Sequence, residues 1–104
     1  MAATMNVTYE IRKTAEYEKW FAEQSEKTKL IVDARLQRIA VDGHFGMINV
    51  FDGLIELKWK SGLRIYTHRF GSKVLIVLLG GNKNDQDHDI RQAKKILARL
   101  LEET

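Results

Sequence analysis

Residues 54–79 read LIELKWKSGLRIYTHRFGSKVLIVLL, and this stretch decides the fold. Apolar and polar residues alternate over residues 54–60 and again over residues 63–70, which is typical of half-buried β-strands. Ser61-Gly62 and Gly71-Ser72 are two-residue turn signals between them. Residues 73–79 are apolar at nearly every position, which predicts a strand that is covered on both sides or lies at the sheet centre. The stretch therefore predicts three consecutive antiparallel strands.

The flanking sequence predicts one more strand and three helices. Residues 6–12 alternate apolar with polar, so they predict a strand. Thr14 and Ser25 are each suited to capping a helix, and a regular apolar stripe predicts a last helix beyond residue 85. Gly46 and Gly53 bracket a looser connection. The element order is therefore β-α-α-β-β-β-α, which predicts an α+β fold, an antiparallel sheet with helices packed on one face.

Length and composition limit the function classes. The 104 residues are enough for one domain, and we expect a tail over residues 1–5 and a single domain over residues 6–104. The chain has no cysteine and three histidines, so we expect no disulfide, no metal site and no cofactor. It shows no signal peptide and no apolar run of about 18 residues, which predicts a cytoplasmic protein that does not use a membrane.

The positive charge is concentrated in the second half of the chain. The whole sequence has 17 Lys and Arg against 14 Asp and Glu, a formal net charge of +3. The segment 57–83 contains six of the basic residues and no acidic residue. Such a segment produces a local positive field that suits an anionic partner such as a nucleic acid.

Strand alternation places five side chains that could carry a function on the same face of the hairpin. If Ile55 and Leu57 face the helices, the opposite, open face of the hairpin carries Lys58, Lys60, Arg64, Tyr66 and His68. Cations beside groups that can transfer protons are suited to cleaving RNA, whose 2′-hydroxyl attacks the adjacent phosphate without a metal. A solvated strand face with lysines is the simpler interpretation, in which Tyr66 packs across strands, His68 is an ordinary surface residue and Glu56 pairs with a neighbouring base.

Several motifs resemble one known family. They are Gly53-Leu-Ile-Glu-Leu-Lys58, Gly62-Leu-Arg64-Ile-Tyr66, the stretch from Leu78 to Gln86 that reads LLGGNKNDQ, Asp89-Ile90 and Ala93-Lys94. These motifs resemble the RelE/HigB-type toxins of type II toxin–antitoxin systems, and within them the phage-derived "addiction module killer protein" branch. The turn of this branch usually reads Gly-x-Gly-Tyr/Phe-Arg, whereas residues 60–64 read KSGLR, so Lys60 and Leu63 replace the first glycine and the aromatic residue. Lys58 stands where an arginine is more usual.

The resemblance implies a fold similar to that of microbial ribonucleases, and it also implies the function described next. Many members of this family are metal-independent endoribonucleases that cleave mRNA on the ribosome and leave a cyclic phosphate. A cognate antitoxin, of a HigA-like helix-turn-helix type in this branch, neutralises them, and operator DNA is bound only through the toxin–antitoxin complex. The expected catalytic residues are Arg64, Lys83, Lys58, Tyr66 and His68, and the expected RNA-binding residues are Lys60, Arg69, Lys73 and Gln86.

Two alternatives are compatible with the same sequence. A ParE-like protein would share this fold but inhibit DNA gyrase without cleaving RNA. An inactive homologue would bind its antitoxin and act only as a co-repressor. The residues do not separate these alternatives from an mRNA endoribonuclease.

Overall fold

The computed structural model describes residues 8–103, and its elements follow the predicted order with one added strand. Within these residues no helix is both long and apolar enough to span a membrane. The α+β class is confirmed. The elements are β1 (Glu10–Lys13), α1 (Ala15–Ala22), α2 (Glu26–Asp42), β2 (Ile48–Phe51), β3 (Leu54–Lys58), β4 (Leu63–Phe70), β5 (Val74–Asn82), the 3-10 turn η1 (Lys83–Asp85) and α3 (Gln86–Glu102).

The strands form one sheet in the order β1-β5-β4-β3-β2. The β3–β4 hairpin pairs as the alternation predicts, with Lys58 opposite Arg64 and Glu56 opposite Tyr66. The prediction of a purely antiparallel sheet is wrong at one edge, because β1 runs parallel to β5. The chain between these two strands is long enough for such a connection, whereas local sequence patterns do not report the direction of a distant partner.

Strand β2 was predicted as a looser connection. It has only four residues, INVF, and pairs with β3 along the edge of the sheet, with Ile48 opposite Leu57. Asn49 and Val50 are exposed, so the segment does not show the apolar face of a half-buried strand.

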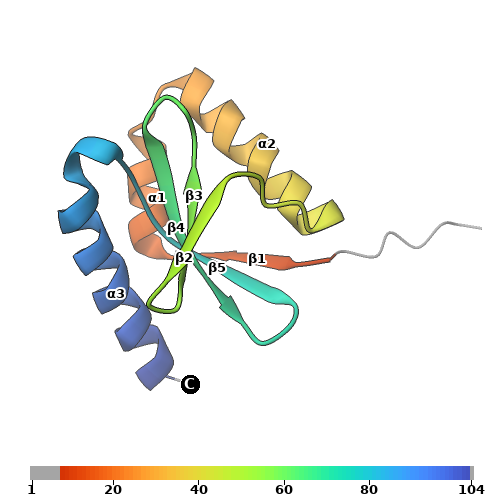
Figure 1. Cartoon of the computed structure of the whole chain (residues 1–104), viewed down its shortest axis with the longest axis vertical. Helices are drawn as coiled ribbons and strands as arrows, with labels where there is room; N and C mark the ends of the chain where they lie inside the picture. Colours follow the sequence, from red (N-terminus) through yellow and green to blue (C-terminus); the bar gives the residue numbers. More distant parts are fainter. Residues whose placement is uncertain (1–7, 104) are drawn as a thin grey trace, which may run out of the picture.

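The helices cover both faces of the sheet, which corrects the prediction that they pack on one face (Figure 1). Helices α1 and α2 bury one face together with Leu57, Ile65 and Val77. Helix α3 packs on the opposite face, over Tyr66 and Leu78. The reason lies in β5, whose successive residues are apolar and point to alternate faces, so that each face needs a cover.

The ends of several elements also differ from the prediction. The predicted caps are confirmed, since the hydroxyl of Thr14 accepts from Tyr17 N and that of Ser25 accepts from Thr28 N. Strand β1 starts at Glu10, and residues 6 and 7 of the predicted strand lie outside the described residues. Strand β5 continues through two glycines that had been expected to follow it, and ends at Asn82. This extension brings the start of η1 beside the turn between β3 and β4.

Candidate functional site

Basic residues from three elements meet where the β3–β4 hairpin turns. Lys58 and Arg64 are opposite each other across the hairpin, and Leu63 is opposite Asn82 on the other side. Lys83 is the residue after Asn82 and therefore lies beside the turn. Its backbone nitrogen donates to Gly62 O at 2.8 Å. We call Lys58, Lys60, Arg64 and Lys83 the hairpin-end cluster. Lys60 and Lys83 are exposed, Lys58 is half-buried, and Arg64 is more deeply buried, with 12% of its side chain exposed.

Gly62 allows Lys83 to come this close. Its φ of +104° lies in a region that residues with a Cβ rarely adopt. A Cβ at this position would also lie 3.2 Å from Lys83 Cγ. The stem of Lys83 therefore lies against the turn, which holds its ammonium group at the end of the hairpin.

Part of the Arg64 guanidinium has a structural role in the turn. Its Nη1 donates to Trp59 O and to Leu63 O, both at 2.9 Å, and so closes the turn from within. Its Nε lies 3.9 Å from Glu56 Oε2 and has no hydrogen-bond partner among the described residues. Arg64 therefore provides a fixed positive charge behind the more exposed lysines.

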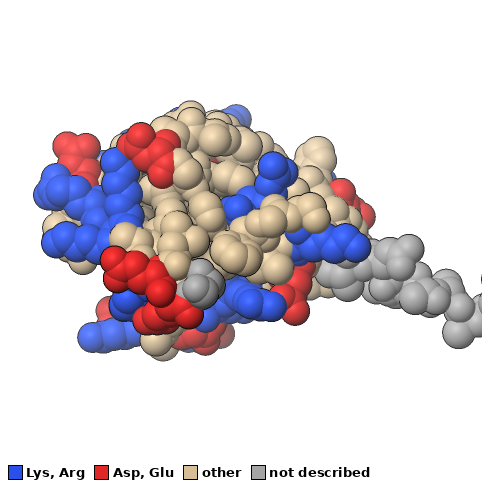
Figure 2. All heavy atoms as spheres, turned by 90° about the horizontal axis from the view of Figure 1, so that it is seen from below, with Lys and Arg blue, Asp and Glu red and all other residues tan. Residues whose placement is uncertain are grey.

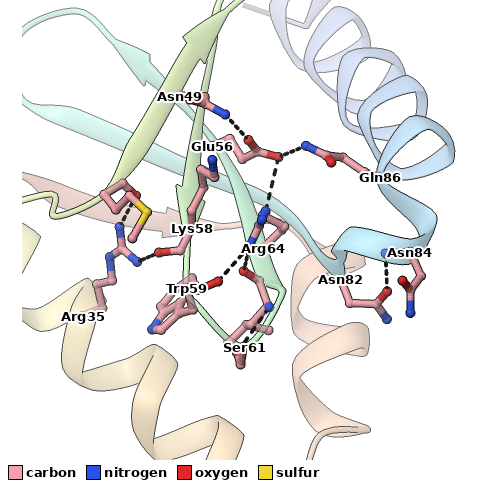
Figure 3. A network of polar contacts seen from close by, with 12 residues as sticks. Arg35, Asn49, Glu56, Lys58, Trp59, Ser61, Arg64, Asn82, Asn84 and Gln86 are labelled. Atoms are coloured by element: carbon pink, nitrogen blue, oxygen red, sulfur yellow. Dashed lines mark hydrogen bonds and ion pairs between the residues drawn. The ribbon is translucent and has the colours of Figure 1, made fainter.

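Glu56 is a site residue, whereas its place in the sequence predicts only a pairing partner for a neighbouring base. Its side chain is fully buried, and each carboxylate oxygen accepts a hydrogen bond: Oε1 from Asn49 Nδ2 at 3.1 Å and Oε2 from Gln86 Nε2 at 2.7 Å (Figure 3). Together with Arg64, these bonds join β2, β3, β4 and the first residue of α3. Alternation already placed this single carboxylate on the face of Lys58, and that was the signal available in the sequence.

Gln86, which we expect to contact RNA, belongs to the same network. Its side-chain amide is half-buried and donates to Glu56 instead of pointing to solvent. Gln86 therefore fixes the start of α3 relative to β3.

Replacing Glu56 with glutamine is expected to lower the free energy of unfolding by about 2 kcal/mol, because two hydrogen bonds to a buried carboxylate are weakened and Arg64 loses its counter-charge. Chemical denaturation of the variant measures this loss. Glu18→Gln, which removes an exposed carboxylate from α1, is the matched control and should be unchanged. Equal stabilities for the two variants would contradict the central place of Glu56.

Tyr66 was predicted to lie on an open face of the sheet, and this prediction is wrong. It is fully buried beneath α3, packed with Ala93, Ile96 and Leu97. Its hydroxyl has no hydrogen-bond partner among the described residues, and burial, followed by the charges of Glu56 and Asp89, raises its pKa well above the usual range. Tyr66 therefore cannot stack on a nucleotide base in this structure, and alternation could not reveal the helix that covers it.

The remaining predicted residues, His68, Arg69 and Lys73, lie away from the hairpin end. Arg64 and His68 are separated by four residues of one strand, a distance of about 13 Å. His68 is half-buried, and its Nδ1 is 2.6 Å from Gly53 O, while Arg69 and Lys73 are exposed. This end of the molecule, which is the lower end in Figure 1, shows basic and acidic side chains interspersed among uncharged ones (Figure 2). The structure thus separates the predicted site into two groups.

The hairpin-end cluster can bind an anion by charge. Within residues 8–103, Lys58, Lys60 and Lys83 have no ion pair, and no group of three or more His, Asp or Glu side chains is placed to hold a metal ion. The lysine ammonium groups are therefore available to a phosphate, with Arg64 adding its charge from behind.

Comparison with known proteins relates the chain to one sequence and to one fold. No protein-family model matches it. An uncharacterized protein of Haemophilus influenzae is 34% identical over 98 residues, which cover 90% of this chain and 98% of that protein. A mutant of the E. coli toxin RelE in the free state is 13% identical, with a TM-score of 0.70, covering 85% of this chain and 96% of that one.

Two solved toxin–antitoxin complexes have the same fold. The intact RelBE complex of E. coli matches with a TM-score of 0.59 and 14% identity, over 71% of this chain and 95% of that one. The RelBE2 complex of Mycobacterium tuberculosis matches with a TM-score of 0.58 and 11% identity, over 73% and 99%. The resemblance to RelE-type proteins found in the motifs is thus confirmed in the fold. The chain has the RelE fold and belongs to the same family as the Haemophilus influenzae protein.

Proposed function

We propose that the protein is the toxin of a toxin–antitoxin pair and that it cleaves mRNA at the hairpin-end cluster. The observation that carries this proposal is the convergence of Lys58, Arg64 and Lys83 at the turn between β3 and β4, on a RelE fold. Lys58 and Lys83 come from separate elements, so an RNA phosphate placed between them would be contacted from two sides.

The chemistry follows from the substrate. The ribose 2′-oxygen attacks the adjacent phosphorus, its proton passes to an acceptor, and the 5′-oxygen leaves with a proton, so that a 2′,3′-cyclic phosphate remains. Negative charge builds up on the phosphoryl oxygens in the transition state, and ammonium and guanidinium groups held in place stabilise it. Glu56 acts as a positioning residue, since its bonds to Gln86 and its charge toward Arg64 fix the groups around the cluster.

The partners in this proposal are an antitoxin and the translating ribosome. Two of the solved neighbours are complexes of a toxin with its antitoxin, which supports a protein inhibitor for this chain as well. We expect the antitoxin to be of the helix-turn-helix type, to bind operator DNA in complex with this chain, and to act on it in the cytoplasm.

Induced expression of the protein without an antitoxin tests the proposal. The expected results are growth arrest and new 5′ ends within translated mRNAs, detected by primer extension, while DNA supercoiling by gyrase is unaffected. Arrest with inhibited supercoiling and intact mRNA would instead assign the ParE-like alternative. Tight antitoxin binding with no arrest would assign a co-repressor.

Replacing Tyr66 with phenylalanine is expected to leave mRNA cleavage unchanged. The buried hydroxyl has no hydrogen-bond partner among residues 8–103, so its removal should alter the free energy of unfolding by less than about 1 kcal/mol. Primer extension on a reporter mRNA measures the activity. A loss of about a hundredfold, as expected for a group that transfers a proton, would show that Tyr66 takes part in the reaction.

A further inference from the structure

A second basic surface adjoins the hairpin-end cluster. A hollow of about 340 Å³ lies between the end of α2, the connection to β2 and the end of β3. None of the residues that line it is acidic, and its basic residues are Arg35, Arg38, His44, Lys58 and Lys60. We call it the basic hollow. Arg35, Arg38 and His44 lie outside the basic segment 57–83.

Arg35 gives the hollow a positive charge that no carboxylate of the described residues neutralises. Its guanidinium donates to three backbone carbonyls, Phe45 O at 2.9 Å, Met47 O at 2.6 Å and Lys58 O, and it lies over the ring of Trp59 at 4.3 Å. Burial lowers its pKa from the usual value. Within residues 8–103 it forms no ion pair. These bonds use three of the five guanidinium N–H donors and fix the position of the group, so Arg35 acts on a ligand mainly through its charge.

The exposed residues of the hollow provide free donors. Arg38 is three residues after Arg35 on α2 and therefore lies on the same side of the helix. In the described part of the chain, the side chains of Arg38, His44 and Lys60 form no hydrogen bond or ion pair with other residues. An anion in the hollow would thus meet unpaired donors above a fixed positive charge.

We propose that the basic hollow binds the ribose-phosphate backbone of the RNA on one side of the cleaved bond. Lys58 connects the two surfaces, because its carbonyl accepts from Arg35 in the hollow while its side chain extends toward Glu56, on the side of the hairpin-end cluster (Figure 3). The two surfaces therefore adjoin at this residue, and one RNA strand could contact both. A polyanion with one charge per nucleotide fits two adjoining cationic surfaces better than an acidic peptide with isolated carboxylates. This inference rests on the proposed function. It adds that an RNA extending beyond the two nucleotides of the cleaved bond binds more tightly than a shorter one.

The experiment compares Arg38→Ala/His44→Ala with the wild type. Fluorescence anisotropy measures the binding of labelled single-stranded RNA, 2′-O-methylated to prevent cleavage, with lengths of about 3 and about 12 nucleotides. The longer RNA is expected to bind the double variant about tenfold more weakly, with a smaller salt dependence, and the shorter RNA equally well. Lys19→Ala/Lys27→Ala removes two exposed charges from α1 and α2 away from the hollow, and it should bind both RNAs like the wild type.

The outcomes separate the two proposals. If Arg38→Ala/His44→Ala binds both lengths as the wild type does, the hollow does not hold RNA, and the proposed function stands. An equal loss for both lengths, or a loss shared by the control variant, would also overturn the inference, because the effect would then be one of general charge. If the wild type binds neither RNA, both proposals fail.

Discussion

Gly80→Ala is expected to lower the free energy of unfolding by about 3 kcal/mol or more, because the added methyl group has no space. A Cβ at this position would lie 2.4 Å from Trp20 Cδ2, well inside the contact distance of two carbon atoms. Trp20 packs in the core between α1 and the sheet, and Gly80 itself is buried and paired with Ile65. The large ring cannot withdraw without opening this core, so the strand or the helix must move.

Gly81→Ala is the matched comparison, since it adds the same methyl group one residue later. On this side the Cβ would meet Asp89 Oδ2 at 2.0 Å, the end of a side chain that can turn away. We therefore expect a smaller loss than at Gly80, and Asp89→Ala should relieve it. Chemical denaturation of both variants measures the difference. Equal stabilities for Gly80→Ala and the wild type would contradict the packing of α1 described here.

Gly80 and Gly81 allow helices to pack closely against both faces of β5. Gly80 faces α1 and Gly81 faces α3, so the absence of both side chains lets helices approach β5 from opposite sides of the sheet. The same strand then delivers Lys83 to the hairpin end. Gly80-Gly81 resembles a turn signal in the sequence, but in the structure it lies within β5 and helps to position the candidate site.

Lys58→Ala/Lys83→Ala is expected to reduce the rate of mRNA cleavage by about a thousandfold or more, since one charged donor to a transition state contributes about a hundredfold. The two residues come from β3 and η1 and approach the hairpin end from separate elements. Both side chains are free of ion pairs within residues 8–103, so their loss should not disturb the fold. Single variants should each show part of the effect.

Primer extension on a reporter mRNA measures this rate, and thermal unfolding confirms that the variant is folded. The control is again Lys19→Ala/Lys27→Ala, which removes the same number of positive charges from exposed positions on α1 and α2. If the control loses as much activity as Lys58→Ala/Lys83→Ala, net charge and not the hairpin-end cluster explains the effect. Full activity of Lys58→Ala/Lys83→Ala would remove the cluster from the reaction.

Much of the fold could be predicted because it depends on local patterns. The alternation over 54–70 predicted the β3–β4 hairpin, and the caps at Thr14 and Ser25 predicted where two helices begin. Pairing between distant segments could not be predicted in this way. The parallel contact of β1 with β5 and the short edge strand β2 depend on partners elsewhere in the chain.

The candidate site was predicted in part for the same reason. Alternation correctly placed Lys58 and Arg64 opposite each other, but it could not show that α3 covers the same face farther along, over Tyr66. Residues 73–79 are apolar on both sides, a pattern that fits a strand covered on both faces or one at the sheet centre, so it did not by itself predict the second cover. The basic hollow depends on Arg35 and Arg38 of α2, which lie far in sequence from Lys58 and meet it only in the folded chain.

Cleavage of an mRNA with a single 2′-deoxy substitution tests the central claim most directly. Purified protein is mixed with translating ribosomes carrying this mRNA or its unmodified form, and the products are mapped together with their 3′ ends. We predict that the unmodified mRNA is cut to a 2′,3′-cyclic phosphate and that the 2′-deoxy mRNA is not cut at the substituted nucleotide. Equal cleavage of both mRNAs, or no cleavage of either, would contradict an RNA-cleaving site built from Lys58, Arg64 and Lys83.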